Sequence, residues 1–163
     1  MKAHPALTGE HEAWRDTVRR FVDREILPHA AKWDEAGEFP RDLYKKAAAA
    51  GLLGLGFPEE YGGVPADYFF RIVSAEEFAR AGSGGLSASL FSHTIGAPPI
   101  AAVGSEELKR RILPSILSGE KISALAITEP SGGSDVASLR TSARKEKGEY
   151  IVNGEKTFIT SGM

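Results

Sequence analysis

The chain has 163 residues, which suffices for one domain of roughly 100–200 residues but not for two complete ones. Its 20 lysines and arginines are interspersed with 22 aspartates and glutamates, so no basic stripe indicates nucleic-acid binding. The absence of cysteine excludes disulfides and thiolate metal sites, and no apolar run approaches the roughly 20 residues of a membrane span.

A long first helix is predicted from Thr8 to about Trp33. Thr8 is a favoured helix cap, and Glu10 and Glu12 place negative charge at the positive end of the helix dipole. One face of this helix is expected to be buried, because apolar residues recur on it at helical spacing. These residues are Trp14, Val18, Phe21, Val22 and Ile26.

Helical patterns continue to Leu117. We expect a helix at Arg41–Ala50 that Gly51 ends in the left-handed conformation, and another at Asp67–Ala81 that the glycines after it interrupt. Ser105 resembles the cap of a further helix that passes Pro114, where a kink or break is expected. Shorter helices rich in small residues are predicted at Leu86–Ile95 and Pro98–Val103.

The four histidines do not form a metal-binding pattern. His93 lies inside a predicted helix without a second histidine or a carboxylate at ligand spacing, so we expect it to be packed or hydrogen-bonded. His11-Glu12 lacks the second histidine of a zinc protease helix. No metal site is predicted.

The apolar period changes to that of strands after Ile122, which predicts an α+β fold. Asn153-Gly154 is the strongest hairpin signal, because both residues tolerate the positive φ of a type I′ turn. The predicted strands are Leu125–Ile127, Arg140–Arg144, Glu149–Val152 and Lys156–Thr160.

The first of these strands runs into a loop rich in turn residues. Pro130 fixes φ, and Gly132 and Gly133 let a ligand approach the main chain, so the loop could direct amides at an anion. Thr128 and Ser134 add hydroxyl groups where ligand contacts are common. A glycine pair alone more often marks an ordinary turn.

The complete pattern is less generic. Ala-Ile-Thr-Glu-Pro-Ser-Gly-Gly-Ser-Asp (126–135) resembles the flavin-contacting signature of the acyl-CoA dehydrogenase family, and Thr-Phe-Ile-Thr (157–160) has the spacing of its second flavin-contacting strand. Phe-Pro-Glu-Glu-Tyr-Gly-Gly (57–63) resembles a link between the family's early helices. The resemblance implies an N-terminal helical domain at 1–120 and the opening of a β-barrel-like middle domain at 121–163, without the C-terminal helical domain.

The resemblance also implies FAD as the cofactor. The Thr128 hydroxyl would bond the polar edge of the flavin, Gly133 and Ser134 would lie near the pyrophosphate, and Ser134 would also contact acyl-CoA. Phe158 is as readily explained as an ordinary apolar strand residue. The implied cofactor-binding residues are Leu125, Ala126, Ile127, Thr128, Gly133, Ser134, Phe158, Ile159 and Thr160.

The implied activity is oxidation of an acyl-CoA thioester to its α,β-enoyl product, with electrons passed to an electron-transfer flavoprotein. We expect a homo-oligomer, a dimer or a tetramer, in the cytoplasm or in the mitochondrial matrix if the source is eukaryotic. The family's catalytic glutamate is expected beyond Met163, so Glu76, Glu77 and Glu129 are not assigned that role. No catalytic residue is assigned within this chain.

Two alternatives remain at the sequence level. An acyl-CoA oxidase or flavin monooxygenase of the same fold would share the loop, and the electron acceptor that reoxidises the flavin would distinguish them. A non-enzymatic helical interaction module would keep the fold without the flavin, and the absence of a yellow colour would identify it.

Overall fold

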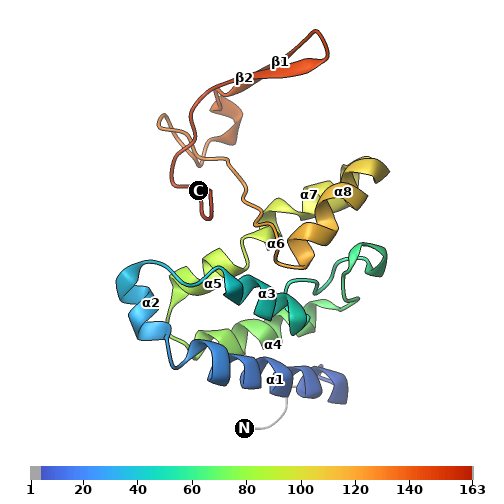
Figure 1. Cartoon of the computed structure of the whole chain (residues 1–163), viewed down its shortest axis with the longest axis vertical. Helices are drawn as coiled ribbons and strands as arrows, with labels where there is room; N and C mark the ends of the chain where they lie inside the picture. Colours follow the sequence, from blue (N-terminus) through green and yellow to red (C-terminus); the bar gives the residue numbers. More distant parts are fainter. Residues whose placement is uncertain (1–4, 163) are drawn as a thin grey trace.

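The computed structural model describes residues 5–162, in which a group of helices is followed by a β-hairpin arm (Figure 1). The hairpin projects at the end of the molecule away from α1, and the last residues fold back toward α5, where the Ser161 hydroxyl donates to the Ser89 carbonyl at 3.4 Å. The helices are α1 (Gly9–Phe21), α2 (Ala30–Ala36), α3 (Asp42–Ala49), α4 (Tyr68–Ala79), α5 (Gly84–Leu90), α6 (His93–Gly96), α7 (Pro98–Val103) and α8 (Glu106–Leu117). The strands are β1 (Ser142–Glu146) and β2 (Glu149–Asn153), and short helical turns occupy Val22–Ile26, Glu59–Tyr61 and Val136–Ser138.

The predicted first helix is divided in three. Thr8 caps α1 as predicted, with its backbone N–H donating to His11 Nδ1 at 2.9 Å. After Phe21 the chain forms a π-helical turn over Val22–Ile26 and restarts as α2 at Ala30. A single helix to Trp33 was therefore wrong, because Pro28 has no N–H to donate and its ring clashes with the preceding turn.

The remaining helices mostly follow the sequence pattern. Gly51 adopts a φ of 79° after α3, and α8 continues through Pro114 to Leu117. The predicted helix Leu86–Ile95 is corrected to α5 and α6, with a turn at Phe91. Tertiary packing accounts for the turn, because the Phe91 ring packs edge-on against Phe78 with centroids 4.8 Å apart.

Two apolar clusters form the core of the helical group. The larger one joins α1, the π-helical turn, α3 and α5, and its fully buried members include Val18, Ile26, Leu53 and Leu90. The smaller one packs α8 against the link that precedes α4. Its buried residues are Phe57, Tyr61, Ala97, Leu113, Ile116 and Leu117.

His93 is buried between these clusters and its Nε2–H donates to the Leu53 carbonyl at 2.8 Å. Burial lowers the pKa of His93 although that carbonyl favours the protonated ring. The prediction of a packed, hydrogen-bonded histidine is confirmed.

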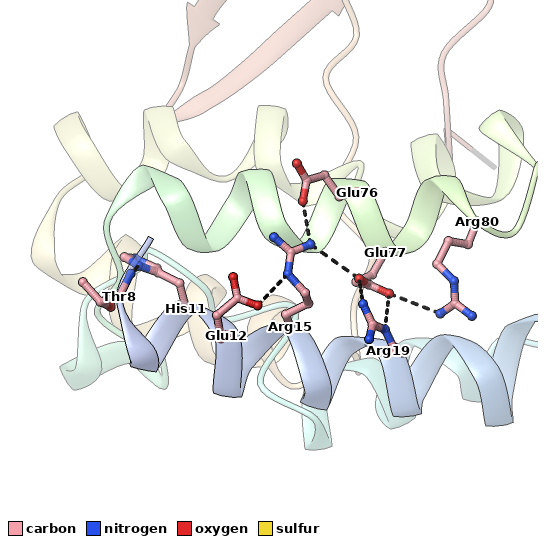
Figure 2. A network of polar contacts seen from close by, with 8 residues as sticks. All are labelled: Thr8, His11, Glu12, Arg15, Arg19, Glu76, Glu77 and Arg80. Carbon is pink, nitrogen blue, oxygen red and sulfur yellow. Dashed lines mark hydrogen bonds and ion pairs between the residues drawn. The ribbon is translucent and has the colours of Figure 1, made fainter. Parts of the chain in front are cut away.

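Helices α1 and α4 lie side by side and share a network of charged groups (Figure 2). Glu77 is only 3% exposed, and its carboxylate accepts from Arg19 at 2.8 and 3.1 Å and from Arg80 at 3.2 Å. Arg15 reaches the same carboxylate at 3.5 Å and binds Glu76 at 2.6 Å. The carboxylate is thus buried with its charge compensated from both helices.

At the start of the same two helices, His11 joins both caps. Its Nε2 lies 3.0 Å from Asp67 Oδ1, while Asp67 caps α4 by accepting from the Phe69 backbone N–H at 2.9 Å. Because His11 Nδ1 accepts from Thr8, Nε2 carries the proton that Asp67 accepts.

The hairpin differs from its prediction in the position of the turn. Strands β1 and β2 pair antiparallel with Glu146 opposite Glu149, which leaves Lys147 and Gly148 as the loop, at φ values of 50° and 90°. These are the positive φ values of a type I′ turn. Asn153-Gly154 is therefore not the turn: Asn153 belongs to β2 and pairs with Ser142.

The strand prediction Glu149–Val152 is confirmed, and Arg140–Arg144 is shifted to Ser142–Glu146. The shift has a local cause, since the backbone N–H groups of Arg140 and Thr141 donate to the Glu129 carboxylate instead of to a strand. Both strands are solvent-exposed along their whole length.

Leu125–Ile127 and Lys156–Thr160 are not strands in residues 5–162. One backbone hydrogen bond joins the two segments, from Thr157 N–H to the Thr128 carbonyl at 3.0 Å. Phe158 has a φ of 56°, which turns the chain out of the extended conformation and stops a ladder from forming.

Candidate functional site

The two segments that resemble flavin-contacting motifs, residues 126–135 and 157–160, lie next to each other in the structure. Besides the Thr157–Thr128 backbone bond, the Lys156 ammonium donates to the Ile127 carbonyl at 2.8 Å. Residues about thirty positions apart in the chain are thereby joined by one main-chain and one side-chain contact. The two predicted segments therefore meet at one place on the molecule.

Glu129 lies at the centre of this place. It is 5% exposed, and its carboxylate accepts from the backbone N–H of Arg140 at 2.8 Å, from that of Thr141 at 2.9 Å and from Lys156 Nζ at 2.9 Å. Thr141, the Arg140 amide and Lys156 hold the pKa of Glu129 far below its usual range. Glu129 is therefore an ionised structural acid with its oxygens already engaged.

The loop after Glu129 is narrow and tightly closed. Glu129 and Gly132 exchange backbone hydrogen bonds of 2.9 and 3.0 Å, and a Cβ on Gly133 would lie 3.1 Å from the Thr128 side chain. Asp135 is used locally, because it accepts from the Ser138 hydroxyl at 2.6 Å. The loop thus brings Gly133 directly over Thr128.

Several polar groups of this loop have no hydrogen-bond partner among the residues that the structure describes. Within residues 5–162, neither the Thr128 hydroxyl nor the backbone N–H groups of Gly133 and Ser134 form a hydrogen bond. Ser134 is exposed, and Thr128 and Gly133 are partly exposed. Donors in this arrangement suit an anionic or carbonyl-bearing ligand.

The second segment presents an aromatic ring. Phe158 is 92% exposed, whereas Ile159 lines a cavity of about 560 Å³ together with Trp33, Leu86 and Ile122. Successive side chains of this segment therefore have different environments, one in solvent and one against the helices. An exposed aromatic held at positive φ is unusual for a protein surface that nothing covers.

The predicted cofactor residues form a mostly accessible surface. Leu125 is 39% exposed, Ala126 and Thr160 are exposed, and Ile127 is partly buried with its carbonyl engaged by Lys156. Lys156 and the contacts of Glu129 with the Arg140 and Thr141 amides were missed by the sequence analysis. The only signal was the position of Glu129, an acid directly after an apolar run, and Lys156 gave none.

Other candidate sites are weaker. A cavity of about 760 Å³ between α4 and α5 is lined by residues between Leu52 and Thr94, so it does not include the loop. In the part of the chain that the structure describes, no cluster of His, Asp and Glu could hold a metal ion, and no helix has the length and apolarity to cross a membrane.

Comparison with known proteins identifies the family. The model of the acyl-CoA dehydrogenase N-terminal domain matches residues 8–120, and that of the acyl-CoA dehydrogenase middle domain matches residues 124–163. The pig mitochondrial long-chain specific acyl-CoA dehydrogenase (Sus scrofa) is 41% identical over 155 residues, which cover 95% of this chain and 36% of that enzyme.

Solved structures agree. A crystal structure from Mycobacterium smegmatis assigned as an acyl-CoA dehydrogenase is 53% identical with a TM-score of 0.91, and the match covers 96% of this chain and 41% of that one. An acyl-CoA dehydrogenase from Bacillus anthracis in complex with FAD is 39% identical with a TM-score of 0.87, over 96% of this chain and 28% of that one. The chain thus spans well under half the length of these relatives.

Proposed function

Because the chain belongs to the acyl-CoA dehydrogenase family, we propose that the protein containing it binds FAD and oxidises an acyl-CoA thioester to its α,β-enoyl product. The observation that carries the proposal is the surface formed by residues 125–134 and 157–160, where unpartnered hydrogen-bonding groups lie beside an exposed aromatic ring. The FAD-bound relative supports the same cofactor.

The residues present fit a flavin in four respects. Thr128 offers a free hydroxyl for the polar edge of the ring system, and the Gly133 and Ser134 amides offer donors for a pyrophosphate. Gly133 approaches Thr128 so closely that any side chain there would crowd that hydroxyl. Phe158 supplies an apolar face that a planar ring could cover.

Bound FAD would supply the chemistry by accepting a hydride from the β-carbon of the substrate. The residues of this chain would hold and orient it, with Ser134 also touching acyl-CoA. They would not remove the α-proton: Glu129 is engaged by three donors and Glu77 by three arginines. We assign the proton-removing glutamate to a part of the protein beyond Met163.

We further assign residues 1–120 to the helical domain and 121–163 to the opening of the middle domain. The proposed electron acceptor is an electron-transfer flavoprotein, and the proposed assembly is a dimer or tetramer of identical subunits. The proposed location is the cytoplasm, or the mitochondrial matrix in a eukaryote; the pig relative is named as a mitochondrial enzyme.

The test is made on the full-length protein. We expect it to purify yellow, and we expect its flavin absorption to bleach when a saturated acyl-CoA is added without oxygen. Recovery of the absorption with the electron-transfer flavoprotein but not with oxygen would identify a dehydrogenase and not an oxidase. A protein that stays colourless after incubation with FAD would contradict the proposal.

Thr128→Val tests the hydroxyl directly. It removes one hydrogen bond at similar side-chain volume, worth about 0.5–1.5 kcal/mol, so FAD should dissociate about 2- to 10-fold more readily. Thr17→Val is the control, since it removes the hydroxyl that donates to the Ala13 carbonyl on the exposed side of α1. Equal FAD dissociation constants for the two variants would show that Thr128 does not contact the cofactor.

A further inference from the structure

The Lys156 side chain connects the two segments of the candidate flavin site. Its ammonium lies 2.8 Å from the Ile127 carbonyl and 2.9 Å from Glu129 Oε1. The backbone of the next residue, Thr157, bonds the Thr128 carbonyl at 3.0 Å. Residues 127–129 are therefore held against 156–157 by three consecutive contacts.

Glu129 extends this connection to the hairpin. One carboxylate oxygen of Glu129 accepts hydrogen bonds from both the Lys156 ammonium and the Thr141 amide. The other oxygen accepts one from the Arg140 amide at 2.8 Å. Both side chains of the pair are shielded, with 4% exposure for Glu129 and 22% for Lys156. A shielded pair of opposite charges is strongly interdependent, because loss of one partner leaves the other uncompensated.

We propose that Glu129 and Lys156 are positioning residues for the flavin, which set both the spacing of its two contact segments and the net charge behind them. The inference rests on the proposed function. Neither residue needs to touch FAD: Glu129 fixes the loop through backbone amides, and Lys156 fixes the end of the first segment through the Ile127 carbonyl.

Removing the charge of Glu129 and removing that of Lys156 should shift the reduction potential of FAD in opposite directions. Reduction adds negative charge to a flavin, so a nearby uncompensated cation favours the reduced form and an uncompensated anion opposes it. Glu129→Gln leaves the Lys156 ammonium without its carboxylate. Lys156→Met leaves the carboxylate, which its backbone donors keep ionised.

The experiment measures the reduction potential and visible spectrum of FAD in the full-length protein and its variants. We expect Glu129→Gln to raise the potential, Lys156→Met to lower it, and the double variant to return toward the wild type. Lys156→Arg keeps the charge and should stay closer to the wild type than Lys156→Met does. Glu155→Gln and Lys145→Met, at exposed neighbouring positions, should leave the potential unchanged.

The outcomes separate this inference from the proposed function. A wild-type protein that never binds FAD refutes the proposed function, and the inference falls with it. A yellow wild type whose potential shifts in neither variant, or shifts in the same direction in both, overturns the inference alone. If Glu129→Gln purifies without FAD, its FAD dissociation constant is compared with that of Glu155→Gln, and equal values overturn the inference.

Discussion

The helical group and the hairpin arm are held together by different means. In the helices, 0% exposed side chains such as Val18, Leu90 and Leu113 form apolar clusters, whereas every residue of β1 and β2 is exposed. The arm is instead organised around one buried carboxylate, Glu129, and the amides that converge on it. The stabilisation of the helices is distributed over many apolar contacts, whereas the arrangement of the arm depends on a few hydrogen bonds.

The largest effect on stability is expected when apolar volume is removed from the helical group and, for comparison, from the hairpin arm. Leu90→Ala, in the larger cluster, should lower the free energy of unfolding by about 2–5 kcal/mol, because it leaves a cavity in a packed core. Val152→Ala removes apolar volume at a position that is 64% exposed on β2 and should change it by less than about 0.5 kcal/mol. Chemical denaturation measures both, and comparable losses would erase the distinction.

The helices also contain a buried charged group, the Glu77 carboxylate with its arginines. Glu77→Gln tests how much its charge contributes to the stability of the protein. We expect the free energy of unfolding to fall by about 1–2 kcal/mol. This is at the low end for a charged hydrogen bond, because Arg19 and Arg80 are partly exposed. Glu76→Gln, whose side chain is 55% exposed, is the control and should cost less than about 1 kcal/mol.

The Glu77 effect should depend on pH. The Arg19 guanidinium, helped by Arg80 and Arg15, holds the pKa of Glu77 below its ordinary value of 4.5 despite burial. The stabilisation is therefore complete above pH 4.5 and declines as pH falls through the lower folded value. Unfolding measured down the acid range should show wild type and Glu77→Gln converging, and a constant difference would contradict the charged pair.

The smallest effect is expected at the hairpin turn. Gly148→Ala places a side chain at a φ of 90° and should weaken the turn by roughly 1 kcal/mol, with loss of NMR contacts between Ala143 and Val152. The unfolding of the helices should hardly change. Gly85→Ala, in α5 with open space around its Cβ position, is the control and should leave the hairpin intact. Persistence of the Ala143–Val152 contacts in Gly148→Ala would contradict the turn.

The sequence was most informative where apolar spacing determines structure. The positions of α1, α3, α4 and α8 followed from periodicity and from caps such as Thr8 and Ser105. The α+β fold class followed from the change of apolar period after Ile122, and the family followed from short, specific motifs. Both kinds of signal are local, so they survive without knowledge of tertiary contacts.

The errors occurred where a distant contact decides the local conformation. Arg140 and Thr141 leave the strand because Glu129, eleven and twelve residues earlier, accepts their amides. The turn formed at Lys147-Gly148 instead of the stronger Asn153-Gly154 signal because strand pairing requires Asn153 opposite Ser142. Lys156 gave no signal in the sequence, because its two acceptors belong to residues 29 and 27 positions earlier in the chain.

The pairing of α1 with α4 also has a consequence for synthesis of the protein. His11 and Asp67 are 56 residues apart, so α1 leaves the ribosome well before the helix on which it packs. At about 5–20 residues per second, the delay is roughly 3–11 s. During that time the Val18, Phe21 and Val22 face has no partner from α4 to cover it, which makes the nascent first helix a natural target for a chaperone that binds apolar segments.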